Sequence, residues 1–207
     1  MQAITYPIGD SLYLNITNRC TNKCSFCIRN KAKLFNCQHQ LWLEKEPTAQ
    51  EVIEAIGDPN KYDQIVFCGY GEPLIRLEAV KKIAKQLKTR FKIRNSKLEI
   101  RLDTNGQANL FWGRNIVPEL KGLIDFISIS LNTDNPNLYA KICQPHFGQS
   151  GYPAIIAFIE ECQKYIPKVE VSIVGLSQID KEACQKIAEQ LGIGFRVRPY
   201  YEDKYVR

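Results

Sequence analysis

The chain has 207 residues, of which 44% are hydrophobic and 24% charged, and its formal net charge is +6. This length and balance favour one globular domain over residues 1–207 and exclude a fibrous or disordered protein. Because residues 1–17 lack the basic and apolar regions of a secretory signal, and no stretch approaches the roughly 20 apolar residues that cross a bilayer, we expect a cytoplasmic protein without a membrane partner.

The first predicted strand covers residues 11–17, where apolar and polar side chains alternate. Three cysteines follow its carboxyl end with the spacing C-x3-C-x2-C: Cys20, Cys24 and Cys27. In a cytoplasmic chain such thiols are more often ligands than disulfides. Because iron–sulfur clusters usually take four thiolates, a set of three predicts a cluster with one iron left open. A zinc site or three unrelated thiols are the alternatives, although zinc would need a fourth Cys or His close by, and the nearest are Cys37 and His39.

A long loop separates the cysteines from the first predicted helix. Residues 31–46 are basic and then aromatic, and loops of this length are often lids or substrate loops, with an ordinary surface insertion as the alternative. The helix is predicted to begin near Pro47 and to end at Ile56, and Thr48 with Glu51 has the spacing of a capping box.

The second predicted strand, residues 62–68, ends in a turn of sequence Gly-Tyr-Gly-Glu-Pro at residues 69–73. Glycines let a backbone approach a ligand closely, and proline fixes the turn. A tight turn without a ligand is the alternative. An amphipathic helix is predicted next, over residues 77–87.

Polar residues end the next two predicted strands, residues 97–103 and 125–131, which flank a helix predicted at residues 109–120. Such polar tips suit hydroxyl and carboxylate groups of a ligand. An ordinary Asn-Gly turn, or hydroxyls bonded to neighbouring backbone, is the alternative. The polar residues are Thr104, Asn105 and Gly106 after the first strand, and Ser128, Ser130 and Asn132 along the second.

The rest of the chain alternates between helix and strand. The predicted elements are a helix at 137–143, a loop at 144–151, a helix at 153–165, a strand at 168–174, a helix at 181–191 and a strand at 194–200. Cys143 and His146 could join Cys37 and His39 in a second metal site, but their spacings match no zinc or cluster pattern. The simpler interpretation is four ordinary residues, or a His146 that contacts the substrate as a proton donor.

Nine basic residues and one acidic residue lie in the segment 81–101. This segment could bind nucleic acid or an anionic substrate. A solvated helix face is favoured instead, because Phe91 is the one aromatic residue in the segment. The sequence therefore leaves a nucleic-acid partner open without supporting it.

The cysteine spacing, with Phe26 directly before the third cysteine, resembles the signature of the radical S-adenosylmethionine (SAM) superfamily. The resemblance covers nearly the whole chain and is nearest to the small TatD-linked radical SAM group, which shares Asn-Ile-Thr-Asn-x-Cys before the cluster and the Gly-Tyr-Gly-Glu-Pro turn. It implies two cofactors, a [4Fe–4S] cluster on the three cysteines and SAM bound to the open iron. Reductive cleavage of SAM would yield a 5′-deoxyadenosyl radical that abstracts hydrogen from a substrate.

The resemblance also implies which residues contact SAM. The turn at residues 69–73 would meet the methionine amino group, although Tyr70 stands where the commoner family form has glycine. The polar strand tips would contact the ribose and the carboxylate, and the last two strands the adenine. The implied cofactor-binding residues are Phe26, Gly69, Tyr70, Gly71, Glu72, Pro73, Thr104, Asn105, Ser130, Asn132, Val174, Gly175, Val197, Arg198, Pro199 and Tyr200.

Six strands alternating with helices predict a parallel α/β sheet with too few units for a closed eight-stranded barrel. The resemblance implies an open, partial (β/α)6 barrel. We expect an enzyme that acts on a small-molecule or nucleotide-like substrate and receives electrons from a flavodoxin- or ferredoxin-type donor. The alternatives are an activating enzyme that places a radical on a partner protein and a non-enzymatic metal or electron-transfer protein. An RNA-methylating enzyme ranks low, because no methyl-carrying cysteine follows Cys184.

Overall fold

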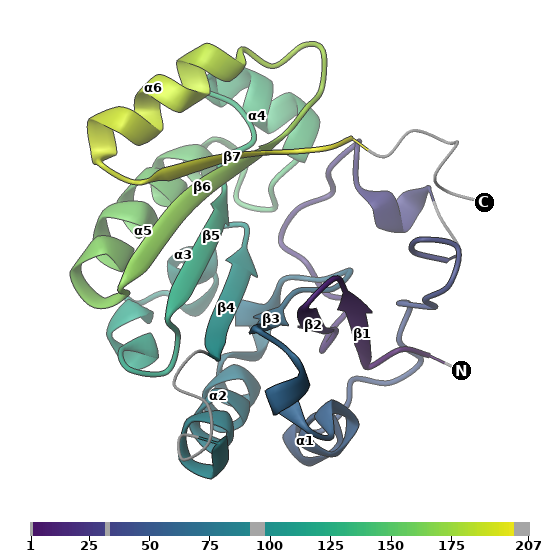
Figure 1. Ribbon diagram of the computed structural model, residues 1–207. Coiled ribbons are helices and arrows are strands. Elements are labelled where there is room, and N and C mark those ends of the chain that lie inside the picture. Colours follow the sequence, from purple (N-terminus) through teal and green to yellow (C-terminus); the bar gives the residue numbers. More distant parts are fainter. Residues whose placement is uncertain (1, 32–33, 92–97, 201–207) are drawn as a thin grey trace.

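The computed structural model describes residues 2–31, 34–91 and 98–200 (Figure 1). Within this part of the chain, seven strands form one sheet in chain order. The first two strands pair antiparallel, and every later pair of neighbours is parallel. The strands are Thr5–Ile8 (β1), Ser11–Leu14 (β2), Gln64–Phe67 (β3), Glu99–Thr104 (β4), Phe126–Ser130 (β5), Lys168–Val174 (β6) and Gly194–Arg198 (β7).

The strand β1 was not predicted from the sequence. It has four residues and contains Pro7, which obscures its alternation. A two-residue turn joins it to β2, and Gly9 in that turn has a positive φ of 55°, which glycine adopts at little cost in such hairpins. The six predicted strands are confirmed. The strand at residues 168–174 has the predicted bounds, the third ends one residue later than predicted, at Thr104, and the other four are shorter. Residue 97 of the predicted third strand lies outside the described residues.

Helices lie along the outside of the curved sheet (Figure 1). None of the described helices is long and apolar enough to cross a membrane. The α-helices are Ala49–Ile56 (α1), Leu77–Phe91 (α2), Ala108–Trp112 (α3), Pro136–Cys143 (α4), Gly151–Tyr165 (α5) and Lys181–Leu191 (α6). Short 3-10 helices are Ile28–Asn30 (η1), Pro59–Lys61 (η2), Pro73–Arg76 (η3), Val117–Leu120 (η4) and Gly148–Ser150 (η5).

The single helix predicted at residues 109–120 is wrong. The structure divides it into α3 and η4. Gly113 ends α3 in the left-handed conformation, with φ 62°, and Pro118 lacks the N–H that would continue an α-helical ladder.

The two faces of the sheet differ in chemistry. Side chains that point toward the helices are apolar and fully buried, because successive residues of a strand face opposite sides. Examples are Ile100, Leu102, Ile127, Ile129, Val171 and Ile173. The opposite face of β4 to β7 carries charged and hydroxyl side chains joined to one another: Arg101, Asp103, Ser128, Glu170 and Arg196. The sheet is therefore an open, partial barrel of the TIM type with a polar inner face.

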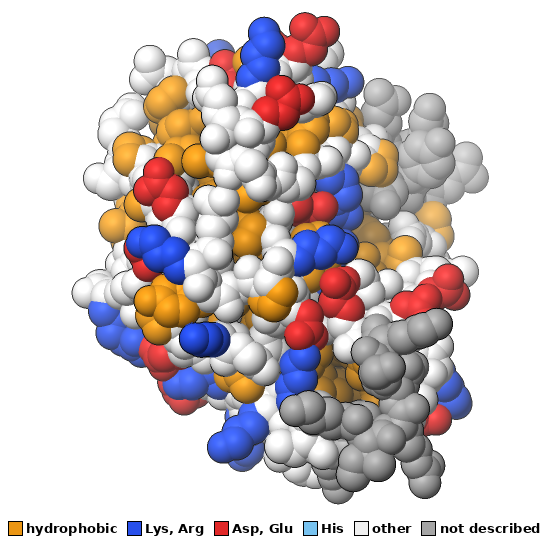
Figure 2. All heavy atoms as spheres, turned by 60° about the vertical axis from the view of Figure 1, so that its left-hand side comes forward, with side chains coloured by type: hydrophobic (Ala, Val, Ile, Leu, Met, Phe, Trp, Pro, Cys, Tyr) orange, Lys and Arg blue, Asp and Glu red, His pale blue; other side chains and the backbone are white. Residues whose placement is uncertain are grey.

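Charges of the basic segment 81–101 are partly paired. Lys81 contacts Glu119, Lys88 contacts Asp125 and Arg101 contacts Asp103. Residues 92–97 of the segment lie outside the described residues. On the face shown in Figure 2, positive and negative side chains are interspersed among apolar patches. This pattern adds no support for a nucleic-acid partner.

The capping box predicted at the start of α1 is confirmed. Thr48 Oγ1 accepts a hydrogen bond from the Glu51 amide (3.2 Å), and the Glu51 carboxylate accepts one from the Thr48 amide (2.6 Å). We expect Thr48→Ala to lower the free energy of unfolding by about 1 kcal/mol, because the Glu51 amide loses its side-chain acceptor. Urea denaturation measures the change. The control Thr48→Ser retains the oxygen and should lie close to wild type; an equal loss in both variants would contradict the capping role.

Candidate active site

The three cysteines lie in the loop that follows β2, beyond the carboxyl end of that strand. Cys20, Cys24 and Cys27 are all half-buried, and Cys27 directly precedes η1. The carboxyl ends of β2 to β7 lie at the same edge of the sheet because these strands are parallel. Ligands of open α/β sheets bind at this edge.

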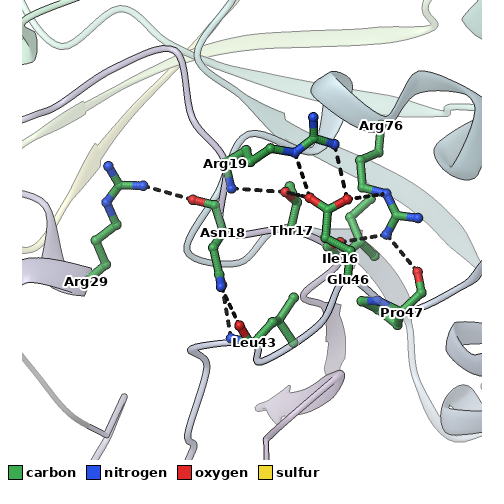
Figure 3. A network of polar contacts seen from close by, with 9 residues as sticks. All are labelled: Ile16, Thr17, Asn18, Arg19, Arg29, Leu43, Glu46, Pro47 and Arg76. Atoms are coloured by element: carbon green, nitrogen blue, oxygen red, sulfur yellow. Dashed lines mark hydrogen bonds and ion pairs between the residues drawn. The ribbon is translucent and has the colours of Figure 1, made fainter.

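A polar network fastens the segment just before Cys20 (Figure 3). The carboxylate of Glu46 accepts hydrogen bonds from Thr17 Oγ1 (2.5 Å) and from Arg19 Nε and Nη2 (2.8 and 3.1 Å), and it pairs with Arg76. Although burial acts in the opposite direction, these hydrogen bonds lower the pKa of Glu46. Asn18 Nδ2 donates to the Leu43 carbonyl (2.7 Å). Part of the long loop predicted at residues 31–46 therefore holds the cysteine loop in place.

The glycine-rich turn packs against the same segment. A Cβ atom on Gly71 would lie 2.4 Å from the Thr17 carbonyl oxygen, and one on Gly69 would lie 2.1 Å from Asn15 Oδ1. The Glu72 amide donates to the Arg19 carbonyl (2.8 Å). The glycines thus permit a close approach of two parts of the chain itself. Their role toward SAM stays a prediction, as do the roles of Tyr70 and Pro73, which are buried.

The Glu72 carboxylate joins the turn to the polar tip of β4. It accepts hydrogen bonds from Thr104 Oγ1 (2.8 Å), the Asn105 amide (2.7 Å) and the Leu74 amide (3.1 Å). Asn105 Nδ2 in turn donates to Thr21 Oγ1 (2.8 Å) within the cysteine loop. Glu72, after β3, therefore contacts Thr104 and Asn105 at the end of β4, and Asn105 contacts the cysteine loop. The resemblance had predicted all three as cofactor-binding residues.

Burial raises the pKa of the cysteine thiols. The pKa of Cys20 rises to about 12 because the thiol is buried and faces the Glu72 carboxylate. A hydrogen bond with Cys143, together with burial, raises that of Cys24, and burial raises that of Cys27. The positive charge of Arg29 opposes the rise at all three. A bound metal would supply the remaining charge needed to hold thiolates.

The donor set suits an iron–sulfur cluster in kind and number, and each neighbouring pair of thiols along the loop interacts electrostatically. No group of three His, Cys, Asp or Glu side chains in the described residues is placed to hold a single metal ion. A cluster needs no such convergence, because each cysteine binds a different iron. The Cys24 side chain contacts Cys143.

A cavity of about 610 Å³ lies beside the cysteine loop. Three of the residues predicted to bind SAM line it, namely Phe26, Gly175 and Tyr200. Its volume is in the range of small-molecule sites. The sequence analysis missed the other lining residues, Ser25, Leu176, Ser177, Gln178 and Lys181. For Leu176, Ser177 and Gln178, the position shortly after a strand predicted to contact adenine was the available signal.

Arg198 brings together the predicted residues of β5 and β7. Its Nη2 donates to Ser130 Oγ (3.1 Å) and to Asn132 Oδ1 (3.5 Å). Its Nε is buried without a hydrogen-bond partner in the described residues, and its charge reaches Cys27. A buried donor of this kind suits an anionic group of a ligand. Of the remaining predicted residues, Val174 is half-buried and Val197 and Pro199 are exposed; none of these three lines the 610 Å³ cavity.

His146 lies on the other side of the cysteine loop. It is exposed and lines a second cavity of about 530 Å³ together with Arg19, Cys20 and Lys23. The structure therefore separates His146 from the cavity that contains Phe26. Cys37 is exposed, His39 packs beside Tyr6 and Cys143 is buried. Within the described residues, these four side chains form no metal-binding group, and a second metal site gains no support.

The charged network on the inner face was missed by the sequence analysis. Arg101 pairs with Asp103 (2.7 Å), and Arg196 pairs with Glu170 (2.8 Å). Ser128 Oγ donates to Glu170 (2.7 Å). Charged residues at alternate positions of β4, β6 and β7 were the signal that could have revealed a polar lumen.

We predict that Glu72 makes the stability of the cluster-free protein fall as pH rises. Burial raises its pKa from 4.5 to about 7, so the folded state holds more protons than the unfolded state between these values. Protonated Glu72 therefore stabilises the folded state in full below 4.5, its pKa in the unfolded chain. This contribution is lost as pH rises through about 7, its pKa in the folded state. The loss is at most about 3 kcal/mol.

The measurement is urea unfolding between pH 5 and pH 8. Glu72→Gln should remove the decrease in unfolding free energy between pH 5 and pH 8 that Glu72 causes. Glu78→Gln, at an exposed position of α2, should leave this decrease unchanged. A Glu72→Gln protein with the wild-type slope would show that another group causes it.

Comparisons with known proteins identify similar sequences and folds. Residues 14–191 match the family model of the radical SAM superfamily. The chain is 28% identical over 148 residues to the dual-specificity RNA methyltransferase RlmN of Bdellovibrio bacteriovorus, a match that covers 69% of this chain and 34% of that protein. The chain thus spans about a third of the length of this relative.

Two solved structures share the fold. A radical SAM methyltransferase from Sphaerobacter thermophilus aligns with TM-score 0.50 and 14% identity, over 97% of this chain and 70% of that one. HydG, a maturase of the [FeFe]-hydrogenase, aligns with TM-score 0.58 and 16% identity, over 93% of this chain and 42% of that one. Because the family model matches most of the chain, the protein belongs to the radical SAM superfamily, whose members are enzymes that use a [4Fe–4S] cluster and SAM.

Proposed function

We propose that Cys20, Cys24 and Cys27 hold the cluster and that SAM occupies the 610 Å³ cavity beside them. The observation that carries the proposal is that the cysteine loop itself forms a wall of this cavity, through Ser25 and Phe26. The opposite wall comes from residues that follow β6 and β7, where the resemblance places the adenine. The cofactor would therefore lie across the carboxyl edge of the sheet.

When bound, the cluster and SAM supply a one-electron cleavage that gives a carbon radical. The residues of the chain bind, orient and exclude water. Arg198 does not line the cavity, but its buried N–H beside Ser130 and Asn132 would suit the SAM carboxylate. Phe26 provides an apolar surface within the cavity. The substrate would lie toward the inner face, where the network of Arg101, Glu170 and Arg196 favours a small polar molecule.

We further assign the chain to the TatD-linked group and to the cytoplasm. The segment Asn-Ile-Thr-Asn-Arg-Cys at residues 15–20 and the turn at residues 69–73 support the first assignment. A reducing compartment suits a chain with eight cysteines and supports the second. The substrate is therefore expected among cytoplasmic small molecules or nucleotides.

Methyl transfer to RNA is a second candidate, supported by the 28% identity to RlmN over 69% of this chain. Activation of a partner protein is a third possibility that no specific contact favours. Incubating the reduced enzyme with isotopically labelled SAM and ribosomal RNA separates the first two, since only the RNA methylating enzyme would label the nucleic acid.

We predict that Cys24→Ala abolishes SAM cleavage, because the cluster would lose one of three thiolate ligands. The measurement is 5′-deoxyadenosine released from SAM by anaerobically reconstituted protein with dithionite. Cys37→Ala is the matched control, since this thiol is exposed and outside the cluster loop. Full activity in Cys24→Ala would overturn the ligand assignment.

The second cavity offers a place for the electron donor. Cys20 is among its lining residues, and the cations Arg19 and Lys23 line it with no carboxylate among the described residues there. Arg19 is paired with Glu46, whereas no ion pair of Lys23 is found in the described part of the chain. An acidic one-electron carrier of the flavodoxin type would complement this charge.

We expect Lys23→Glu to slow SAM cleavage driven by reduced flavodoxin and to weaken its dependence on salt. Cleavage driven by dithionite should stay unchanged, because a small reductant needs no docking surface. Lys186→Glu makes the same charge change on an exposed residue of α6, away from this cavity. It should leave the rate of SAM cleavage unchanged with both reductants. Equal losses with both reductants would point to a changed cluster instead of a docking surface.

A further inference from the structure

The cysteine loop and the end of α4 run side by side in opposite directions. Asn22 and Pro145 form an antiparallel bridge. The Ser25 amide donates to the Ile142 carbonyl (2.9 Å), and the His146 amide donates to the Thr21 carbonyl (2.7 Å). The hydrogen bonds thus hold residues 21–25 against residues 142–146 with one consistent register.

This register places Cys24 directly opposite Cys143. One step forward from Asn22 to Lys23 corresponds to one step back from Pro145 to Gln144, and the Lys23 amide donates to the carbonyls of both Cys143 (3.1 Å) and Gln144 (3.3 Å). The next step brings Cys24 beside Cys143, the last residue of α4. The hydrogen bonds from the Lys23 and Ser25 amides to the carbonyls of Cys143 and Ile142 hold the two cysteines next to each other, as a disulfide requires.

The side chains meet as this geometry requires. A hydrogen bond joins the thiols of Cys24 and Cys143. Cys143 is fully buried and also accepts a hydrogen bond from Asn132 Nδ2 (3.5 Å), whereas Cys24 is half-buried. An oxidant entering from solvent would therefore reach Cys24 first, with Cys143 behind it.

We propose that Cys24 and Cys143 are an oxidation site, at which the cluster-free protein forms a disulfide that withholds Cys24 from the cluster. The second half of this inference rests on the proposed function, because it takes Cys24 as a cluster ligand. The first half rests on the paired segments alone. The disulfide protects Cys24 from irreversible oxidation until a thiol reductant restores both cysteines.

Hydrogen peroxide is the oxidant class. It reacts with the thiolate, so the raised pKa of Cys24 makes the first step slow. Two steps balance the reaction. Peroxide oxidises the Cys24 thiol to a sulfenic acid and is reduced to water. The Cys143 thiol then attacks the sulfenic sulfur, which forms the S–S bond and releases a second water. Without Cys143, the sulfenic acid would proceed to sulfinic acid, which thiol reductants do not reverse.

The test is disulfide mapping of the full-length, cluster-free protein after exposure to peroxide. Cleavage with trypsin and chymotrypsin, at Lys, Arg and Phe, gives each relevant cysteine its own peptide: residues 20–23, 24–26, 27–29 and 142–147. We expect the cross-link between peptides 24–26 and 142–147 to predominate in mass spectra taken without reduction. Predominant cross-links among Cys20, Cys24 and Cys27, or no cross-link at all, would overturn the proposal.

Cys143→Ala should abolish the cross-link and increase the fraction of Cys24 found as sulfinic acid. Cys162→Ala removes an equally buried thiol from α5 and should leave the cross-link as in wild type. If Cys143→Ala fails to fold, Cys143→Ser supplies the same readout with a hydroxyl in place. A sulfinic fraction of Cys24 that is equal in wild type and variant would contradict protection by Cys143.

Cluster uptake separates this inference from the proposed function. Peroxide-treated wild type should assemble a cluster from iron and sulfide only after dithiothreitol, as followed by visible absorbance. Assembly without dithiothreitol, in protein that carries the cross-link, would overturn both the withholding role and the assignment of Cys24 as a ligand. If no cross-link forms while Cys24→Ala still loses the cluster, the inference falls and the proposed function stands.

Discussion

The buried carboxylate of Glu72 links three strand ends on which the candidate site depends. Its oxygens accept hydrogen bonds from the tip of β4 and from η3, while its amide bonds to the Arg19 carbonyl after β2. An ionised carboxylate in this environment would be costly without such donors. The position of the cysteine loop is therefore set by contacts made at the ends of neighbouring strands as well as by its own sequence.

The sheet divides the molecule into an apolar outer layer and a polar lumen. Leu102 and Ile129 pack toward the helices, whereas Arg101 and Ser128 on the adjoining positions face inward. Buried charges persist in a protein when they are paired, and the ladder of Arg101, Glu170 and Arg196 meets this condition. The fold thereby offers a confined polar volume next to the loop that would carry the cofactor.

Local patterns in the sequence predicted most of the elements and the region of the site. The capping box at Thr48 and the six strands as separate elements follow from local spacing, since the residues involved are neighbours in the chain. The parallel pairing was inferred from the alternation of strands and helices. The antiparallel strand β1 was missed because Pro7 hides its alternation. The pairing of Cys24 with Cys143 could not be predicted, because it joins residues far apart in sequence through the docking of a loop on a helix end. Likewise, the role of Gly71 in accommodating the Thr17 carbonyl depends on a tertiary contact.

The sheet described here is not closed on itself, so it has two edges, at β1 and at β7. An unpaired edge can recruit a strand from another molecule and begin aggregation. Pro7 removes one backbone donor from β1, and Arg196 and Arg198 place positive charges along β7. Both edges of the described sheet thus carry residues that discourage a second chain from adding a strand to it.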